Sequence, residues 1–473
     1  MSNPEPSFQQ LDRSIGAVVG SAVGDALGAG YEFASPPMAE EVALRRGTLT
    51  GQPPGWWTDD TAMAYGVLEV AANRGEVLSK DALNEIGERF LDWYRSGPPD
   101  VGMLTRRVLS RARSGSELEQ LATAALADSP NSAGNGSLMR TGPVALAHLG
   151  DPSAVAEAAR RVSSLTHPHK DAVEACVLWS VAIERSISTG ELVGPESGLA
   201  YIELSRREWW RSRIAEAERV DPSTFNPNGW AVTALQAAWA AIVAASGKGR
   251  PFETGLREAV SIGDDTDTVA AIAGALLGAA HGFTSIPFSW RRGLAGWPPG
   301  ANTFDLVSLT TLAVRHAVPD AAGWPTVHSM QDAYRAFGPQ GLSLSFTEDD
   351  SVLFGDVAAL PEVDADAFLS LCRIGRGDLR GDDHHLIWLL DGPDNLDSSR
   401  AVSDAADAIE ELRADRMSVF VHCVRAESRT PAVALVWLTR HRGLSSDEAL
   451  NLVLNAFPGI NQDQVLALAG RPR

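Results

Sequence analysis

The sequence predicts two domains: an all-α domain over residues 8–320 and a small α/β domain over residues 346–473. The first prediction rests on Ala-rich segments in which apolar residues recur every three or four positions, the period of a helix with one buried face. The second rests on short strand-like runs that alternate with helical segments. Residues 321–360 carry Pro, Gly and acidic residues with weaker periodicity, which favours a linker, placed at residues 321–345, and the entry to the second domain.

In the first domain, the spacing predicts helices at residues 61–73, 80–95, 153–164, 171–188, 231–246 and 268–281. Loops dense in Gly, Pro, Asn and Asp separate them, and no stretch alternates as a strand would. In the second domain, we expect strands at residues 385–390 and 418–422, and helices at residues 398–414, 430–441 and 446–455.

The composition limits the function. The formal net charge of −20 opposes non-specific binding to nucleic acids and to anionic membrane surfaces. The three cysteines do not suggest a disulfide framework, and the first residues do not resemble a signal peptide. The most apolar stretch, residues 269–280, is too short to cross a bilayer. We therefore expect a cytoplasmic protein with no membrane partner.

Two acidic clusters, each at the start of an apolar helix, are the main candidates for chemistry. They are TDDT at residues 58–61 and DDTDT at residues 264–268. Asp and Thr also cap helices, so capping alone is the competing interpretation of each cluster. A cap uses only one or two side chains, however, and further adjacent carboxylates repel one another unless a cation offsets them. Carboxylates and hydroxyls favour a hard ion such as Mg²⁺, Mn²⁺ or Ca²⁺, and two facing clusters could hold a pair of ions.

Five segments taken together resemble the ADP-ribosylglycohydrolase family and follow the family's order. They are GSAVGDALG at residues 20–28 followed by Glu32, WTDDT at 57–61, NGSLMR at 135–140 followed by Pro143, THPH at 166–169 and GDDTDT at 263–268. Five motifs over more than half of the chain are far more specific than one short pattern. The resemblance implies an all-α fold and a hydrolase that cleaves the glycosidic bond of ADP-ribose attached to protein side chains or small molecules.

The resemblance also implies the site. A binuclear Mg²⁺ (or Mn²⁺) centre would be held by Thr58, Asp59, Asp60, Asp265, Asp267 and Thr268. Glu32 stands where some members place a glutamate that gates the site, and Asp59, Asp60 and Asp265 join it as catalytic candidates. One residue departs from the family pattern, since Asp264 stands where a second glycine is usual. An extra carboxylate there would either tighten metal binding or crowd the site.

The substrate loop is expected to bind ADP-ribose through Asn135, Gly136 and Ser137, because glycine lets a pyrophosphate approach backbone N–H groups. The competing interpretation of this loop is an ordinary turn. His167 is a second candidate for ligand contact, although a lone loop histidine is more often structural. Asp25 is interpreted as a buried hydrogen-bonding anchor.

Near the C-terminus, Cys423 and Arg429 are separated by five residues, after a strand-like run and before a helix. This arrangement resembles the phosphate loop of the dual-specificity and tyrosine phosphatases. The resemblance implies that Cys423 is a thiolate nucleophile, that Arg429 holds the phosphate and that Asp391 is the general acid, with Asp394 as its rival. A phosphoprotein would then be a second partner.

Two residues depart from the phosphatase pattern. Ala426 replaces the usual glycine, and Glu427 places a carboxylate within an anion-binding loop. A phosphate-binding or purely structural module is therefore the alternative for this domain. For the whole chain, the alternative to a hydrolase is an ADP-ribose-binding module coupled to a phosphatase.

Overall fold

The structure, a computed structural model, describes residues 7–317, 329–347, 351–381 and 383–470. The chain divides into two compact units. The first comprises Met1–Ile286 and Trp290–Ala322, and the second comprises Pro287–Ser289 and Gly323–Arg473.

The first unit consists mainly of helices. They are α1 (Phe8–Gly28), α2 (Asp59–Arg74), α3 (Lys80–Arg95), α4 (Met103–Leu109), α5 (Leu118–Asp128), α6 (Val144–Ala147), α7 (Pro152–Ser164), α8 (Lys170–Thr189), α9 (Leu204–Ala217), α10 (Ala231–Ala245), α11 (Pro251–Ser261), α12 (Thr266–His281) and α14 (Thr303–Ala317). A short ribbon pairs β1 (Ala295–Gly296) with β2 (Ala301–Asn302), and a one-turn helix, α13 (Phe288–Arg291), lies where the chain changes units.

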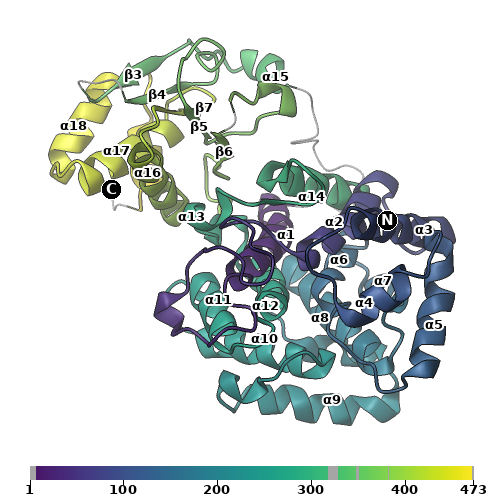
Figure 1. Ribbon diagram of the computed structural model, residues 1–473. Helices are drawn as coiled ribbons and strands as arrows, with labels where there is room; N and C mark the ends of the chain where they lie inside the picture. Colours follow the sequence, from purple (N-terminus) through teal and green to yellow (C-terminus); the bar gives the residue numbers. More distant parts are fainter. Residues whose placement is uncertain (1–6, 318–328, 348–350, 382, 471–473) are drawn as a thin grey trace. The chain divides into compact units, whose positions relative to one another are not determined.

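Helices α1 and α12 form the centre of this unit and run in opposite directions, with α2, α8, α10, α11 and α14 packed around the pair (Figure 1). Glycines on every fourth residue of α1 face the backbone of α12. A Cβ atom on Gly24 would lie 2.1 Å from the carbonyl oxygen of Ala270, and one on Gly20 would lie 2.5 Å from that of Gly274. The two backbones are therefore in direct contact, which brings the C-terminal end of α1 beside the N-terminal end of α12.

The second unit contains a five-stranded sheet with the order β3-β4-β7-β5-β6. The strands are β3 (Ser343–Ser345), β4 (Val352–Asp356), β5 (Ala367–Ser370), β6 (Asp383–Leu386) and β7 (Val419–Cys423). All pairings are parallel except that of β3 with β4. Helix α16 (Ser398–Ala414) lies between β6 and β7 in the chain, and β7 is followed by α17 (Arg429–His441), α18 (Ser446–Ala456) and α19 (Gln462–Leu468) (Figure 1). Strand β7 is buried throughout, as the middle strand of such a sheet should be.

The helices predicted from the spacing are confirmed in both units, with ends within two residues of the expected ones. The strand predicted at residues 418–422 is confirmed one residue later. The strand predicted at residues 385–390 is wrong beyond Leu386. There the backbone N–H and C=O of Leu390 bond to the side chain of Asn395 and form a loop instead of a ladder. The expectation of no strand in the helical part is corrected by the β1–β2 ribbon.

Part of the predicted linker, residues 321–328, lies outside the described residues. The remainder is folded with the second unit and contains α15 (Gln331–Arg335) and β3. The carboxylate of Asp378 accepts hydrogen bonds from the Ser329 hydroxyl and the Met330 N–H, which attaches this segment to the unit. Among the helices described, none combines the length and the apolar character needed to cross a membrane.

Candidate functional site

The two acidic clusters lie at the N-terminal ends of α2 and α12, where unpaired N–H groups favour negative charge. Thr58 is the N-cap residue of α2, and Asp265 is that of α12. Asp25 of α1 anchors the first cluster, since its carboxylate accepts hydrogen bonds from the N–H groups of Thr58 and Thr61 at 2.9 Å each. Asp25 is fully buried and caps α2, as expected of an anchor.

The clusters meet at the Thr58 hydroxyl. Its Oγ1 lies 2.8 Å from Asp25 Oδ1, 3.1 Å from Asp60 Oδ2 and 3.4 Å from Asp267 Oδ2. Carboxylate oxygens of Asp25, Asp60 and Asp267 lie within 4.8 Å of one another. Three helices that are distant in the sequence therefore place their carboxylates around one point.

A second group of carboxylates adjoins the first and shares Asp267. It joins Asp267 to Glu32 and Asp265, again with oxygens within 4.8 Å of one another. The segment carrying Glu32 is attached to the start of α12, because the N–H of Phe33 donates to the Asp264 carbonyl at 2.8 Å. Glu32 and Asp267 are nearly inaccessible to solvent.

Burial and mutual repulsion raise the pKa values of these carboxyl groups. Burial, followed by the charges of neighbouring carboxylates, raises the pKa of Glu32 to about 9 and that of Asp59 to about 8. The same causes hold the pKa values of Asp60 and Asp267 well above the ordinary range. So many buried acids are costly unless a cation offsets them.

The donor set fits a hard divalent cation. Asp60 Oδ1 is buried and has no hydrogen-bond partner among the residues that the structure describes, so it has a free lone pair where the clusters meet. The neighbouring groups are carboxylate and hydroxyl oxygens, the ligands preferred by Mg²⁺, Mn²⁺ and Ca²⁺. Thr268 is also buried close to the acids and borders a cavity beside them.

A cavity of about 630 Å³ opens beside the acids, which is large enough for a dinucleotide-sized ligand. It is lined by Glu32, Asp59, Asp265, Asp267 and Thr268 on one side, and by Gly134, Asn135, Gly136 and His167 on another. Asn135 connects the two sides, because its Nδ2 donates to Asp265 Oδ2 at 2.7 Å. All of the predicted acids except Asp60 therefore face one cavity together with Asn135 and Gly136 of the predicted substrate loop.

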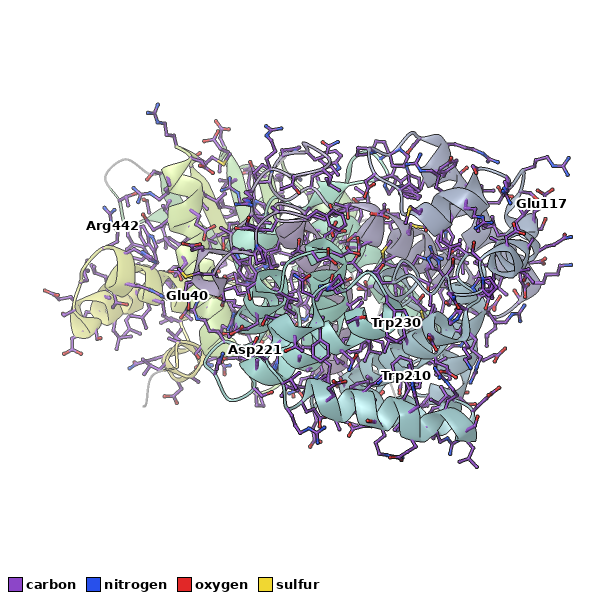
Figure 2. The ribbon with its side chains drawn as sticks, turned by 60° about the horizontal axis from the view of Figure 1, so that its bottom comes forward. Glu40, Glu117, Trp210, Asp221, Trp230 and Arg442 are labelled. Atoms are coloured by element: carbon purple, nitrogen blue, oxygen red, sulfur yellow. The ribbon has the colours of Figure 1, made fainter. Side chains whose placement is uncertain are left out.

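The loop is attached to the start of α10. The N–H of Asn135 donates to the Gly229 carbonyl at 3.1 Å, and the N–H of Ala231 donates to the Ala133 carbonyl at 3.0 Å. Trp230, labelled in Figure 2, lies between these two bonds and is 39% exposed. The segment around it therefore holds the loop in place.

Ser137 lies apart from the other predicted ligand-binding residues. Its side chain is fully buried, and its Oγ accepts a hydrogen bond from the Ser163 hydroxyl at 2.9 Å. It does not border the cavity. The prediction that its side chain reaches a ligand is therefore corrected, and we assign Ser137 to the support of the loop.

His167 borders the cavity with one ring nitrogen engaged behind it. Arg140 Nη2 donates to Thr166 Oγ1 at 2.5 Å, and Thr166 Oγ1 lies 2.6 Å from His167 Nδ1. If the threonine hydroxyl donates onward, Nδ1 is an acceptor and the neutral ring carries its proton on Nε2. Burial, followed by the charge of Arg140, holds the pKa of His167 well below its usual value, which favours this neutral form.

Asp264, the departure from the family pattern, does not belong to either carboxylate group. Its φ is +65°, in the left-handed region where glycine is favoured and where Asp is tolerated better than most residues. Its Oδ2 accepts a hydrogen bond from the N–H of Asn228 at 2.9 Å. The additional carboxylate therefore supports a loop, and its charge also contributes, after burial, to the raised pKa of the adjacent Asp265.

Sequence reasoning missed three residues at this site. Asp100 lines the cavity from a Pro-rich loop, where a single acid gives no pattern to detect. Asn228 is fully buried, and its Oδ1 accepts a hydrogen bond from the N–H of Asp265 at 3.1 Å. Arg140 is a fully buried cation behind the cavity, and its place in the NGSLMR motif was the available signal.

The family model for ADP-ribosylglycohydrolases matches residues 6–321. The chain belongs to the ADP-ribosylglycohydrolase family. Its relatives include the ADP-ribosyl-(dinitrogen reductase) glycohydrolase of Rhodospirillum rubrum, which is 31% identical over 59% of this chain and 89% of the relative. The ADP-ribosylarginine hydrolase Tri1 of Pseudomonas putida (strain GB-1) is 30% identical over 61% of this chain and 75% of the relative.

The human ADP-ribosylhydrolase ARH3 is 26% identical over 61% of this chain and 91% of the relative. A solved structure described as an ADP-ribosylglycohydrolase-related protein complex is 30% identical, with a TM-score of 0.47, and covers 65% of this chain and 99% of that chain. Since the family match ends at residue 321, the second unit has to be interpreted from its own geometry.

In the second unit, Cys423 ends strand β7 and Arg429 begins helix α17. In the sheet, β7 lies between β4 and β5, which are consecutive strands in the chain. The carboxyl ends of strands at such a change in strand order commonly border a ligand site. The N–H of Ala426 donates to Cys423 Sγ at 3.3 Å, so the loop curves around the sulfur. Ala426 adopts a φ of +56°, the conformation that glycine would adopt most easily.

The side chains around this loop are paired. Arg429 Nη1 donates to the Leu371 carbonyl at 3.0 Å, and its Nη2 lies 3.0 Å from Asp391 Oδ2. Asp391 also accepts a hydrogen bond from the Ser428 hydroxyl, so Asp391, and not Asp394, contacts the loop. Glu427 is paired with Arg425 beside the loop.

Proposed function

We propose that this chain is a divalent-metal-dependent hydrolase that releases ADP-ribose from modified side chains or small conjugates. The observation that carries the proposal is the meeting of acids from α1, α2 and α12 beside a cavity that the substrate loop also lines. The family and the relatives named as hydrolases of ADP-ribosylated dinitrogen reductase and ADP-ribosylarginine support it.

The proposed metal centre holds two Mg²⁺ (or Mn²⁺) ions, with Thr58, Asp59, Asp60, Asp265, Asp267 and Thr268 as its ligands. When bound, such a centre polarises ribose hydroxyls and positions a water molecule. Asp267 is central to this assignment because it belongs to both carboxylate groups.

The remaining groups of the chain bind the substrate and move a proton. Bare N–H groups near Gly136 suit the pyrophosphate, and His167 Nε2–H can donate to a phosphate or ribose oxygen across the cavity. Cleavage at the ribose C1″ passes through an oxocarbenium-like state that an adjacent carboxylate stabilises. Glu32 borders the cavity within the second carboxylate group and is placed to take the proton of the attacking water.

The proposal is tested by ADP-ribose release from arginine-linked and serine-linked substrates and from O-acetyl-ADP-ribose, with Mg²⁺, with Mn²⁺ and with chelator. We expect metal-dependent release that Asp267→Asn abolishes. The matched control is Asp221→Asn at an exposed aspartate that borders neither cavity nor cluster (Figure 2). If the wild type binds ADP-ribose and metal but releases nothing from any substrate, the first unit is a binding module and the proposal fails.

A second candidate function is cysteine-dependent phosphate-ester hydrolysis by the second unit. It is favoured by the strand–loop–helix arrangement that places the Cys423 sulfur, the Ala426 N–H and Arg429 around one loop. In this assignment Cys423 attacks phosphorus, Arg429 holds the phosphate oxygens and Asp391 protonates the leaving oxygen.

The second function is tested on the full chain with an aryl phosphate. Turnover should persist in chelator and in Asp267→Asn, and it should disappear in Cys423→Ser. Arg429→Lys should retain little activity, because lysine keeps the charge but loses the planar fork. Turnover that is absent from the wild type, or that survives Cys423→Ser, refutes this assignment.

A further inference from the structure

Helix α9 lies at the edge of the first unit (Figure 1), and only three of its fourteen residues are buried. It nevertheless carries two adjacent tryptophans, Trp209 and Trp210, whose rings meet edge to face at 5.2 Å. Trp210 is fully buried, and its Nε1 donates to Glu174 Oε2 at 2.7 Å, which attaches α9 to α8. Trp209 is only half-buried. The attachment of the helix is therefore explained by Trp210, and Trp209 can serve another purpose.

The ring of Trp209 is held between two arginines. The Cζ atom of Arg206 lies 3.9 Å from the ring centroid, and that of Arg213 lies 4.1 Å from it. Two guanidinium groups this close to one centroid would repel each other on a single face, so each covers a different face. Arg206 is itself fixed to α8, since its Nη2 donates to Asp171 Oδ1 at 2.5 Å and its Nε donates to Glu174 Oε2 at 2.8 Å. The Trp209 ring therefore has a fixed orientation.

This ring supports Trp230, the N-cap residue of α10 (Figure 2). The centroids of Trp209 and Trp230 are 6.3 Å apart and their planes meet at 64°, which is an edge-to-face contact. Trp230 lies between the two hydrogen bonds that attach the substrate loop to α10, and it forms an isolated bridge with Gly134. Gly134 and Gly229 both line the cavity beside the acids. A shift of the Trp230 ring would therefore move the edge of that cavity.

The same support reaches His167. Asp171, which Arg206 binds, lies near the start of α8, four residues after His167. A Cβ atom on Gly136 would lie 3.2 Å from His167 Nε2, so the histidine ring packs on the substrate loop. Trp209 is therefore connected to both segments that we expect to bind ADP-ribose, through Arg206 on one side and through Trp230 on the other.

We infer that Trp209 is a positioning residue for ADP-ribose, which it holds in register by fixing Trp230 and, through Trp230, the loop at residues 133–136. None of the α9 residues borders the cavity, so this role does not require contact with the ligand. The kinetic consequence rests on the proposed hydrolase function. Because the loop binds the ligand and the acids carry out the chemistry, loss of Trp209 should weaken binding and leave kcat almost unchanged.

The test compares the full-length wild type with Trp209→Leu and Trp209→Phe. In Trp209→Leu, the dissociation constant of free ADP-ribose, measured by calorimetry with Mg²⁺, should rise about three- to tenfold, the effect of one lost edge-to-face contact. KM for any substrate that the wild type hydrolyses should rise by the same factor, with kcat changed less than about twofold. Trp209→Phe should remain within about twofold of wild type, because a phenyl ring also stacks between guanidinium groups.

Hydrogen exchange followed by mass spectrometry reports on the loop without any assay of activity. The segment at residues 131–136 contains the Asn135 N–H, which donates to the Gly229 carbonyl. Exchange in this segment should be faster in Trp209→Leu and unchanged in Trp209→Phe. The matched control is Trp239→Leu on α10, because Trp239 is buried, is bonded to Glu218 and does not border the cavity. It should leave both loop exchange and ADP-ribose binding unchanged.

A double-mutant cycle tests whether Trp209 acts through Trp230. In the Trp230→Leu background, adding Trp209→Leu should change the dissociation constant of ADP-ribose by less than about twofold. Independent effects of the two substitutions, equal acceleration of loop exchange in the control, or unchanged ADP-ribose binding in Trp209→Leu overturns the inference. If no substrate turns over but binding and exchange respond as expected, the proposed hydrolase fails while the positioning role stands; a wild type that does not bind ADP-ribose refutes both.

Discussion

Replacing Glu32 with glutamine should stabilise the metal-free protein while removing its hydrolase activity. The side chain is 5% exposed, and the two side chains have almost the same shape. Burial, and then the charges of Asp265, Asp100 and Asp59, raise the pKa of Glu32 to about 9 in the folded protein. Glutamine has no charge to bury, so it avoids that cost, but it cannot accept the proton of the attacking water.

The magnitude follows from linkage between protonation and folding. A carboxyl with a raised folded pKa contributes stability below its unfolded pKa, near 4.5, and that stability is lost as the pH rises towards about 9. At about pH 7.5 the pH lies about three units above the unfolded pKa. This interval corresponds to about 4 kcal/mol of lost folding stability. We expect about 2–4 kcal/mol of stabilisation by Glu32→Gln at this pH, because neighbouring carboxyls adjust their protonation, and less than about 1 kcal/mol near pH 5.

The assay is urea denaturation of wild type and variant in chelator near pH 5 and pH 7.5. Saturating Mg²⁺ or Mn²⁺ should then reverse the order of stability, because a cation stabilises the folded carboxylate form. A gain of the same size at both pH values, or a variant that is less stable than wild type in chelator, would refute the reasoning that repulsion among buried acids dominates this site.

Three further predictions concern the scaffold. Asp25→Ala should destabilise the first unit by about 3 kcal/mol in urea denaturation, because the buried N–H groups of Thr58 and Thr61 lose their acceptor; a neutral effect would show that Asp25 is not an anchor. Gly24→Ala should cost about 3 kcal/mol or more by the same assay and should lower metal affinity in calorimetry, since its Cβ would meet the α12 backbone; unchanged metal affinity would contradict this. Ala426→Gly should raise the unfolding free energy of the second unit by about 0.5–1 kcal/mol by relieving a left-handed conformation, and a loss of stability would show that the lost methyl contacts matter more.

The acid groups could be predicted because most of their members are adjacent in the sequence. A run such as Asp264 to Thr268 is visible without knowing the fold, and a helix start explains why its side chains converge. Asp100 could not be found in this way, because a single carboxylate becomes part of the site only through the path of its loop. The burial of Ser137 was equally hidden, since its neighbours Ser163 and Cys176 come from other helices.

In the fold, too, local features were predictable and features that depend on distant contacts were not. Helices with regular apolar spacing were predictable to within two residues, because their period is a local property. The strand predicted beyond Leu386 was wrong because apolar residues 387–389 are buried in a loop that the Asn395 side chain holds. Such a bond depends on the chain turning back on itself, and the spacing of apolar residues does not indicate it.

The glycine contact between α1 and α12 determines how the site can respond to ions of different size. Because the two backbones touch at Gly20 and Gly24, the helices have no side-chain layer that could compress or expand between them. Any adjustment to a larger or smaller cation must come from rotation of a few carboxylates. Mg²⁺–oxygen distances are about 2.0–2.1 Å and Ca²⁺–oxygen distances about 2.3–2.6 Å. The small residues of two buried helices, none of which touches the ion, would thus fix the spacing of the carboxylates. That spacing would determine which metal–oxygen distances the site accepts.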